Sequence, residues 1–215
     1  MDVQKAARAA GAAGERRGYE HAKRALDIFG SCVLLVITAL PAAIIAVLTK
    51  LDDPGPVLFK QTRVGRYGRH FTIYKFRTMV ADAEKLQREM DKYNEVGGAY
   101  FKMKDDPRVT RVGRWLRKLS LDEIPQFINV LTGDMSLVGP RPLPITGYEN
   151  EDWYVEKVTV PPGMTGLWQI SGRSDLSGEE AAALDLQYVR NRSMLFDLKL
   201  LLATVPALIR RKGAA

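Results

Sequence analysis

The feature that most constrains the fold is a run of 21 residues without a charge, from Ile28 to Leu48, in a chain of 215 residues. About 20 apolar residues suffice for a helix to cross the hydrocarbon core of a bilayer. A cleavable signal peptide is disfavoured because the run is longer than the apolar core of such a peptide and starts only after 27 residues. A buried core helix is the alternative, although a helix that is apolar on all sides is unusual in so small a domain. The run therefore predicts a membrane-associated helix.

Pro41 determines how this helix is expected to insert. Proline removes a backbone donor and kinks a helix, and the apolar residues before it (28–40) give only about 20 Å of helix. That length is short of the hydrocarbon core, which is about 30 Å thick. Residues 8–27 and residues 49–69 carry five basic side chains each, so charge gives no inside–outside asymmetry. These features favour a re-entrant helix that breaks at Pro41 and returns to the cytoplasmic side, with a kinked span as the alternative.

The rest of the chain predicts a mixed architecture. We expect an α+β fold, mostly helical, with the N-terminal re-entrant (Pro-broken) membrane helix, a short β-hairpin and interfacial amphipathic helices. A basic flexible tail (residues 1–18) precedes the membrane-associated helix (residues 19–50), and a cytoplasmic domain (residues 51–212) follows it. The expected elements of that domain are hairpin strands at 56–65 and 70–76, an amphipathic helix at 81–93, helices at 108–118 and 178–191, and a surface-lying closing helix at 195–211.

Composition narrows the chemistry. The chain holds 32 Lys and Arg against 25 Asp and Glu, a formal net charge of +7. This excess indicates an anionic partner, which the charge alone leaves open among nucleic acid, a phosphorylated ligand and anionic lipid. A single cysteine excludes an internal disulfide framework and a multi-cysteine zinc site, and two histidines disfavour a histidine metal centre or a Ser-His-Asp triad.

A carboxylate pair at residues 122–123 has two interpretations. Ser120 and Glu123 match a capping box, which would leave Asp122 to complement a helix dipole. The other interpretation comes from four basic residues that can share one helix face just before the pair: Arg111, Arg114, Arg117 and Lys118. Cations beside a helix start can bind phosphate, and an ionised Asp122 held there would be a nucleophile toward phosphorus.

Further candidate phosphate ligands lie along the chain. Arg141 stands between two prolines that fix its backbone, and a guanidinium suits bidentate phosphate binding; the alternative is a rigid loop that directs Arg141 to water. Lys75 and Arg77 would point to one face of a strand, unless they only guard a sheet edge by charge. Arg173 ends a glycine-containing stretch that permits close backbone approach. Trp168, in the same stretch, is expected to pack in the core or at a membrane interface.

Several motifs in a fixed order, spread over roughly residues 21–210, carry a family resemblance. They are Lys23-Arg24…Asp27, Pro41, Gly55-Pro56-Val57, Gln61-Thr62-Arg63, Tyr74–Met79, Asp106-Pro107-Arg108, Ser120–Glu123, Gly133–Pro142 and Pro162–Arg173. In these residues the chain resembles the bacterial sugar transferases, the monotopic polyprenyl-phosphate phosphoglycosyl transferases. One departure is Leu40, where many small members have a serine whose hydroxyl could satisfy backbone groups released at the kink.

The resemblance implies an enzyme that moves a sugar-1-phosphate from a UDP-sugar to undecaprenyl phosphate. UMP is released, and the undecaprenyl-diphosphate-sugar starts exopolysaccharide, capsule or O-antigen synthesis. Asp122 would be the covalent nucleophile, Mg²⁺ the cofactor, and Asp122 with Glu123 its protein ligands. The expected substrate- and phosphate-binding residues are Lys75, Arg77, Arg117, Arg141 and Arg173.

The resemblance also implies a location. The protein would sit in the bacterial inner membrane with its catalytic domain, residues 51–212, facing the cytoplasm and touching lipids of the cytoplasmic leaflet. No nucleic acid is expected as a partner, and a homodimer is one option for the oligomeric state. The motifs do not distinguish glucose, galactose and N-acetylated sugars. A basic module that binds nucleic acid or lipid, or a non-catalytic scaffold of a polysaccharide assembly complex, would not need the intact carboxylate pair.

Overall fold

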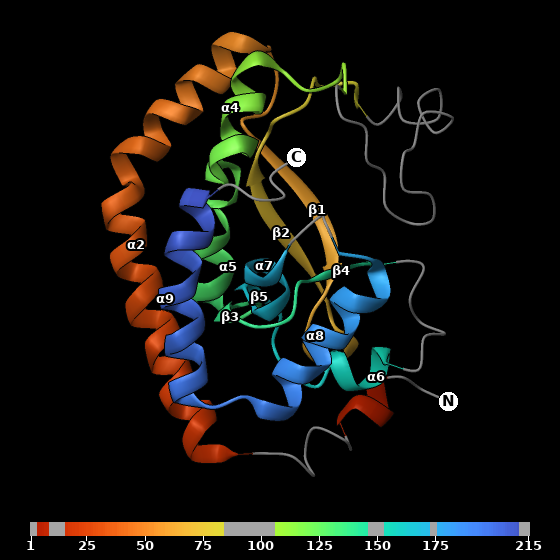
Figure 1. Cartoon of the computed structure of the whole chain (residues 1–215). Coiled ribbons are helices and arrows are strands. Elements are labelled where there is room, and N and C mark those ends of the chain that lie inside the picture. Colours follow the sequence, from red (N-terminus) through yellow and green to blue (C-terminus); the bar gives the residue numbers. More distant parts are fainter. Residues whose placement is uncertain (1–3, 9–15, 84–105, 146–152, 173–175, 211–215) are drawn as a thin grey trace.

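The computed structural model describes residues 4–8, 16–83, 106–145, 153–172 and 176–210. A long helix, α2 (Arg17–Asp52), runs along one side of the molecule with α9 (Met194–Arg210) beside it (Figure 1). Small sheets occupy the middle, and shorter helices cover the opposite side. The α+β class with a helical majority, a small sheet and one long apolar helix near the N-terminus is confirmed.

Helix α2 contains the uncharged run and continues through Pro41, and Figure 1 shows it bending in its C-terminal third. Among the described residues it is the one helix that is long and apolar enough to cross a membrane, yet only 11% of its most apolar window is buried in the protein. Val36 and Leu40 are more than two-thirds exposed. A soluble core helix would bury this surface, so the core-helix alternative is wrong.

The first residues of the chain differ from the sequence expectation. Helix α2 begins at Arg17, inside the predicted tail of residues 1–18. Residues 4–8 are helical, and Ala7 is fully buried beside Val64 and Tyr154. These five residues therefore pack on the domain, because Ala7 fills a place in a small hydrophobic cluster.

The predicted hairpin is confirmed. Strand β1 (Leu58–Val64) pairs antiparallel with β2 (His70–Phe76), and the turn between them places Tyr67 and Gly68 in the left-handed region. Strand β4 (Leu143–Pro144) adds to the other edge of β1. A second, parallel pair joins β3 (Ser136–Val138) to β5 (Gly163–Thr165). Close packing between Gly139 and Gly163 leaves no room for a side chain at either position.

The remaining helices are short except for two. They are α4 (Arg111–Leu119), the 3-10 turn η3 (Leu121–Glu123), α5 (Gln126–Thr132), α6 (Tyr154–Lys157), α7 (Leu167–Ser171), α8 (Gly178–Asn191) and α9. Helix α8 has the predicted bounds, and a capping box between Ser177 and Glu180 starts it. The predicted helix at 81–93 lies outside the described residues beyond Ala83.

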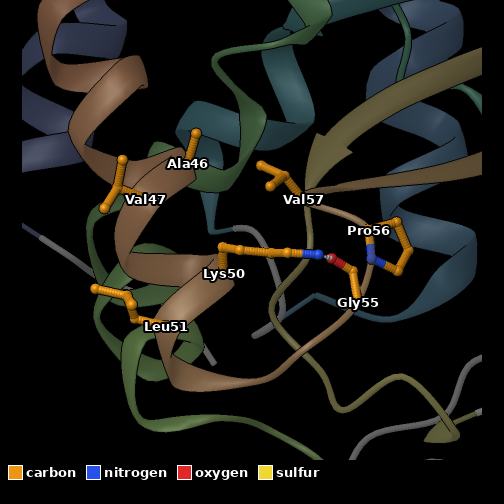
Figure 2. Close-up of a pocket in the computed structure, with 7 residues that line it drawn as sticks. All are labelled: Ala46, Val47, Lys50, Leu51, Gly55, Pro56 and Val57. Carbon is orange, nitrogen blue, oxygen red and sulfur yellow. Dashed lines mark hydrogen bonds between the residues drawn. The ribbon is translucent and has the colours of Figure 1, made fainter.

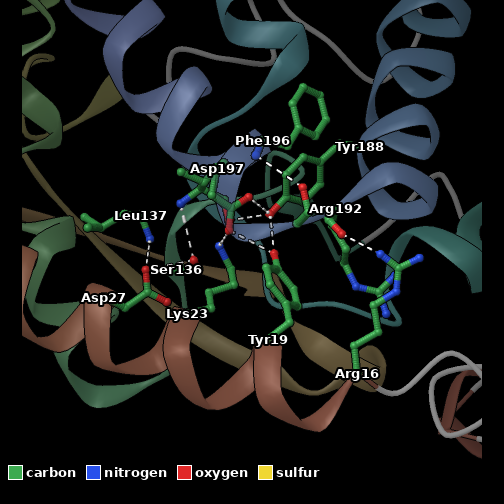
Figure 3. Close-up of polar contacts among 12 residues, drawn as sticks. Arg16, Tyr19, Lys23, Asp27, Ser136, Leu137, Tyr188, Arg192, Phe196 and Asp197 are labelled. Atoms are coloured by element: carbon green, nitrogen blue, oxygen red, sulfur yellow. Dashed lines mark hydrogen bonds and ion pairs between the residues drawn. The ribbon is translucent and has the colours of Figure 1, made fainter.

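A buried polar cluster fixes the base of α2 to the domain (Figure 3). We call it the α2 polar cluster, and its members are Tyr19, Lys23, Asp27, Ser136, Tyr188 and Asp197. The ammonium of Lys23 lies 2.7 Å from the carboxylate of Asp197, which is fully buried. Asp27 accepts hydrogen bonds from the hydroxyl of Ser136 and the backbone N–H of Leu137 at 3.0 and 2.9 Å. Four segments, α2, β3, α8 and α9, thus meet through charged and polar groups.

Candidate active site

The carboxylate pair sits on η3, the turn between α4 and α5. Helix α4 ends at Leu119, and the capping residue Ser120 adopts a left-handed conformation (φ 55°, ψ 24°) and donates its backbone N–H to the Arg117 carbonyl. No side-chain cap forms at Ser120, so the predicted capping box with Glu123 is wrong. The physical reason is that Ser120 closes the preceding helix, in a geometry that a helix N-cap does not use.

Lys75 of β2 reaches both carboxylates of the pair. Its ammonium donates to Glu123 Oε1 at 2.8 Å and lies 3.7 Å from Asp122 Oδ2. The guanidinium of Arg141 approaches the same Glu123 oxygen to 3.6 Å. The Asp122 side chain is 14% exposed and the Arg141 side chain 42%. The pair is therefore half-enclosed, with a cation on the open side that a soluble anion can reach.

Burial raises the pKa of the Asp122 carboxyl. The charge of Lys75 opposes this shift, and the neighbouring Glu123 adds to it. Arg117 and Arg141 also lower the pKa, but more weakly than Lys75 does. Burial dominates because desolvation disfavours the charged form more than the surrounding cations favour it. An aspartate whose anion is incompletely compensated is more basic and a better nucleophile than an exposed one.

The structure divides the predicted cationic face of α4. Arg117 turns inward, donates from Nε to the Thr78 hydroxyl at 2.9 Å, and interacts electrostatically with Asp122. Burial lowers the pKa of Arg117, and the attraction of Asp122 opposes that change. Arg111 and Arg114 are exposed to the outside. Arg117 is thus the member of the set that the fold brings to the pair.

Arg77 is held elsewhere. Its guanidinium donates to the carboxylate and the backbone carbonyl of Asp53, the residue that follows α2, and only 6% of Arg77 is exposed. Gly55 packs against the same guanidinium so closely that a Cβ there would lie 3.0 Å from a terminal nitrogen. Arg77 therefore fastens the turn after α2 to the end of β2, and the structure does not place it beside the carboxylate pair. Arg173 lies outside the described residues.

Two supports of Arg141 were not foreseen from the sequence. The ring of Trp168 lies 5.3 Å from the Arg141 guanidinium, a cation–π arrangement. Asp185 of α8 is buried, pairs with the Lys157 ammonium at 2.7 Å and interacts with the backbone N–H of Arg141. Burial raises the pKa of Asp185, and Lys157 opposes the shift. Of the two, only Asp185 could have been noticed in the sequence, because it is an acidic residue on the mostly apolar, inward face of an amphipathic helix.

Asp122 and Glu123 are the candidate ligands for Mg²⁺ at this site. Within the part of the chain that the structure describes, no three His, Cys, Asp or Glu side chains gather as a metal cage. Mg²⁺ commonly takes one or two carboxylates and completes its shell with waters and substrate phosphates. The oxygens of Asp122 and Glu123, adjacent on one turn, fit that mode of binding.

The site is thus a carboxylate pair beside lysine and arginine side chains, in a domain that packs on a long apolar helix, and cations in this arrangement are suited to bind phosphate groups. The family model described as bacterial sugar transferase matches residues 18–211, so the chain belongs to that family.

Curated relatives agree with this assignment. The chain is 44% identical over 200 residues to "Galactosyl transferase CpsE" of Streptococcus agalactiae, covering 91% of this chain and 44% of that protein. It is 41% identical to "Undecaprenyl-phosphate galactose phosphotransferase" of Salmonella typhimurium, covering 93% of this chain and 43% of that protein. It thus spans less than half the length of these two relatives. "Exopolysaccharide production protein ExoY" of Rhizobium meliloti is 40% identical, with 90% of this chain and 88% of that protein covered.

Proposed function

We propose that this protein transfers a sugar-1-phosphate from a UDP-sugar to undecaprenyl phosphate, releasing UMP and forming undecaprenyl-diphosphate-sugar. The observation that carries the proposal is the half-buried Asp122, with a raised pKa, beside Lys75, Arg117 and Arg141. Family membership and the printed names of the relatives, which include an undecaprenyl-phosphate galactose phosphotransferase and an exopolysaccharide production protein, support the same reaction class.

The proposed chemistry has two displacements at one phosphorus. An Asp122 carboxylate oxygen attacks the sugar-bearing phosphorus of the donor, the bond from that phosphorus to the bridging diphosphate oxygen breaks, and UMP leaves with the electron pair. An oxygen of undecaprenyl phosphate then attacks the aspartyl-phosphosugar, and the Asp122 carboxylate leaves. The guanidinium of Arg141 and the ammonium of Lys75 offset the charge of the phosphoryl oxygens in both steps.

Asp122 and Glu123 would hold Mg²⁺ together with the donor diphosphate. When bound, the ion supplies charge neutralisation that lowers the repulsion between a carboxylate and a diphosphate. The protein's own contribution is orientation. The ammonium of Lys75 lies 2.8 Å from Glu123 and fixes that carboxylate, whereas it lies 3.7 Å from Asp122 and holds that carboxylate less tightly.

The proposed location is the bacterial inner membrane, with the catalytic domain in the cytoplasm and α2 inserted as a re-entrant helix. Support comes from the exposed apolar surface of α2, from Pro41 within it, and from the balanced basic flanks. Helix α9 has an exposed apolar face of its own, and we propose that it lies at the interface. Its exposed members include Leu195, Leu198, Leu202 and Val205.

The test is the intact mass of the full chain after incubation with UDP-sugar and Mg²⁺ without lipid acceptor. We expect a sugar-phosphate adduct on the wild type, released UMP, and no adduct on Asp122→Asn. An adduct that persists in Asp122→Asn, or kinetics that require both substrates bound at once, would contradict the covalent route. A panel of UDP-sugars in the same assay identifies the sugar.

A further inference from the structure

An apolar groove lies where α2 ends and the chain turns toward β1 (Figure 2). Its volume is about 480 Å³, within the range of ligand sites. Its lining residues are Ala46, Val47, Lys50, Leu51, Gly55, Pro56 and Val57. The Lys50 side chain crosses from the helix and donates to the Gly55 carbonyl at 2.8 Å, so one ammonium stands in an otherwise apolar wall. This mostly apolar surface suits the hydrocarbon part of an amphiphile.

The groove is connected to the carboxylate pair through one hydrophobic cluster. Its buried members are Ile45, Phe76, Leu116 and Ile124. Ala46 and Val57 of the groove pack on this cluster, and so does Leu121, which precedes Asp122. The backbone of Val57 also accepts the Arg77 N–H at 2.9 Å, next to the end of β2 that carries Lys75. Groove and reaction site are therefore built on the same packed unit.

At its other end the groove opens onto the exposed apolar face of α2. Val47 is 59% exposed and Leu51 77%, and the face continues toward the middle of the helix through residues spaced three or four apart. These residues are Ile37, Leu40 and Ile44. A ligand lying in the groove would thus have apolar surface along α2 in one direction, and it would rest on the hydrophobic cluster that also holds Leu121, the residue before Asp122.

We infer that this groove binds the isoprenoid units nearest the phosphate of the lipid acceptor, and that the acceptor enters along α2. The inference rests on the proposed function and names the place where its second substrate is held. The UDP-sugar is an unsuitable occupant because it is polar and carries several charges, whereas the groove offers one cation. A phospholipid chain would also fit the apolar wall, so the experiments below compare undecaprenyl phosphate with bulk phospholipid.

The experiment fills the groove and leaves the donor reaction as an internal reference. Val47→Trp and Leu51→Trp place a large ring at the groove, and both positions are exposed enough to keep the fold. Leu48→Trp is the matched control, because Leu48 is 45% exposed on the same helix and does not line the groove. We expect the two groove variants to raise the KM for undecaprenyl phosphate about tenfold, or about 1.4 kcal/mol, and the control to leave it unchanged.

Formation of the sugar-phosphate adduct without acceptor should be the same in all four proteins. An acceptor phosphate with only two isoprene units is too short to fill the groove. Its KM should therefore rise less in the groove variants than the KM for undecaprenyl phosphate does. An unchanged KM in both groove variants, with normal adduct formation, would overturn the groove assignment. Absence of the adduct from the wild type would instead contradict the proposed function.

A second measurement separates acceptor from bulk lipid. A photoreactive residue at position 47 of the full chain, in vesicles of phosphatidylethanolamine and phosphatidylglycerol, should crosslink to added undecaprenyl phosphate. A photoreactive residue at position 48 should crosslink mainly to phospholipid. Equal capture of undecaprenyl phosphate at both positions would show a general lipid surface and overturn the inference.

Discussion

Two clusters of this molecule combine carboxylates with lysine, and they differ in how completely the charges are matched. In the α2 polar cluster, Asp197 accepts from Lys23 at 2.7 Å and from two tyrosine hydroxyls at 2.9 Å each, and its side chain is fully buried. At the reaction site the ammonium of Lys75 bonds to Glu123, and its distance to Asp122 is 3.7 Å.

The difference supports our proposal that Asp122 is a reactive carboxylate and Asp197 a structural one. A buried carboxylate whose oxygens are all engaged gains nothing by forming a new bond, and it fixes the elements that hold it. Asp122 is desolvated and has weaker contacts with cations, so its anion is less stabilised by the protein. Bond formation with a phosphorus centre would therefore be more favourable for Asp122 than for Asp197. The predictions below test this contrast in order of expected size, and the last two both concern pH.

The largest expected effect is on turnover in Asp122→Asn. The amide keeps the size of the side chain but lacks the anionic oxygen, so we expect the rate to fall by about 10³-fold or more. Steady-state release of UMP with both substrates is the measurement. Asp134→Asn, at an exposed site, is the control and should retain full activity. If the rate of the Asp122→Asn variant is within tenfold of the wild type, Asp122 is not the reactive carboxylate that distinguishes this site from the α2 polar cluster.

The next largest effect is on stability in Asp197→Asn. The substitution leaves the Lys23 ammonium buried without its counter-charge, and breaking such a pair costs about 3–5 kcal/mol. Denaturant unfolding in detergent should therefore show a large loss of unfolding free energy. The exposed Asp134→Asn should change it by about 0.5 kcal/mol or less. Equal stability of the two variants would mean that the α2 polar cluster does not fix the helix.

A smaller effect is expected for Arg141→Lys. Lysine keeps the charge but loses the planar fork and much of the stacking on Trp168. We expect a loss of about 1.5–3 kcal/mol in transition-state binding, or roughly tenfold to a hundredfold in kcat/KM for the UDP-sugar. Arg8→Lys, at an exposed position, should have no effect. Full activity of Arg141→Lys would make Arg141 a structural residue.

The smallest effect concerns pH. Because the folded-state pKa of Asp122 is raised by burial, the folded protein binds this proton more tightly than the unfolded chain, and stability falls as pH rises between the two pKa values. Asp122→Asn removes that loss, so its stability relative to the wild type should improve from pH 4 to pH 8. Unfolding free energies of both proteins at the two pH values measure this. A relative stability that declines toward pH 8 would contradict a raised pKa.

The same shift sets the acid limb of the reaction. In the proposed mechanism the anion of Asp122 attacks, so adduct formation should decline as pH falls through the raised pKa, above the range of an ordinary aspartate near 3.9. Single-turnover adduct formation across pH measures it. An acid limb at the ordinary position of an aspartate would show that burial is compensated by the surrounding cations.

Much of the fold could be predicted from local patterns. The uncharged run gives α2, alternation with a glycine-containing turn gives the hairpin, and Ser177 three residues before Glu180 gives the start of α8. The same pattern misled at Ser120 and Glu123, because the sequence does not show that α4 ends at Leu119 and that Ser120 caps it with left-handed geometry. A capping motif thus has meaning only when the preceding residues are not already helical.

The candidate site was predictable in its residue types and less so in its partners. Lys75 and Arg141 come to the carboxylate pair from distant segments as expected. Arg77, two residues from Lys75, belongs to Asp53 instead, because β2 ends at Phe76 and the alternation of a strand no longer applies beyond it. Trp168 and Asp185 required tertiary structure, since their contacts with Arg141 span 27 and 44 residues of sequence.

The hydrogen bonds of Asp27 to Ser136 and Leu137 have a consequence for how this protein should be handled. Strand β3 leads directly into the loop that carries Arg141, so α2 is bonded to the segment that positions this arginine. Deleting α2 to obtain a protein without this apolar helix would therefore also remove the bonds of Asp27 to β3. We therefore expect lipid or detergent conditions that displace α2 to change the position of Arg141 as well, so these conditions should be held constant between assays.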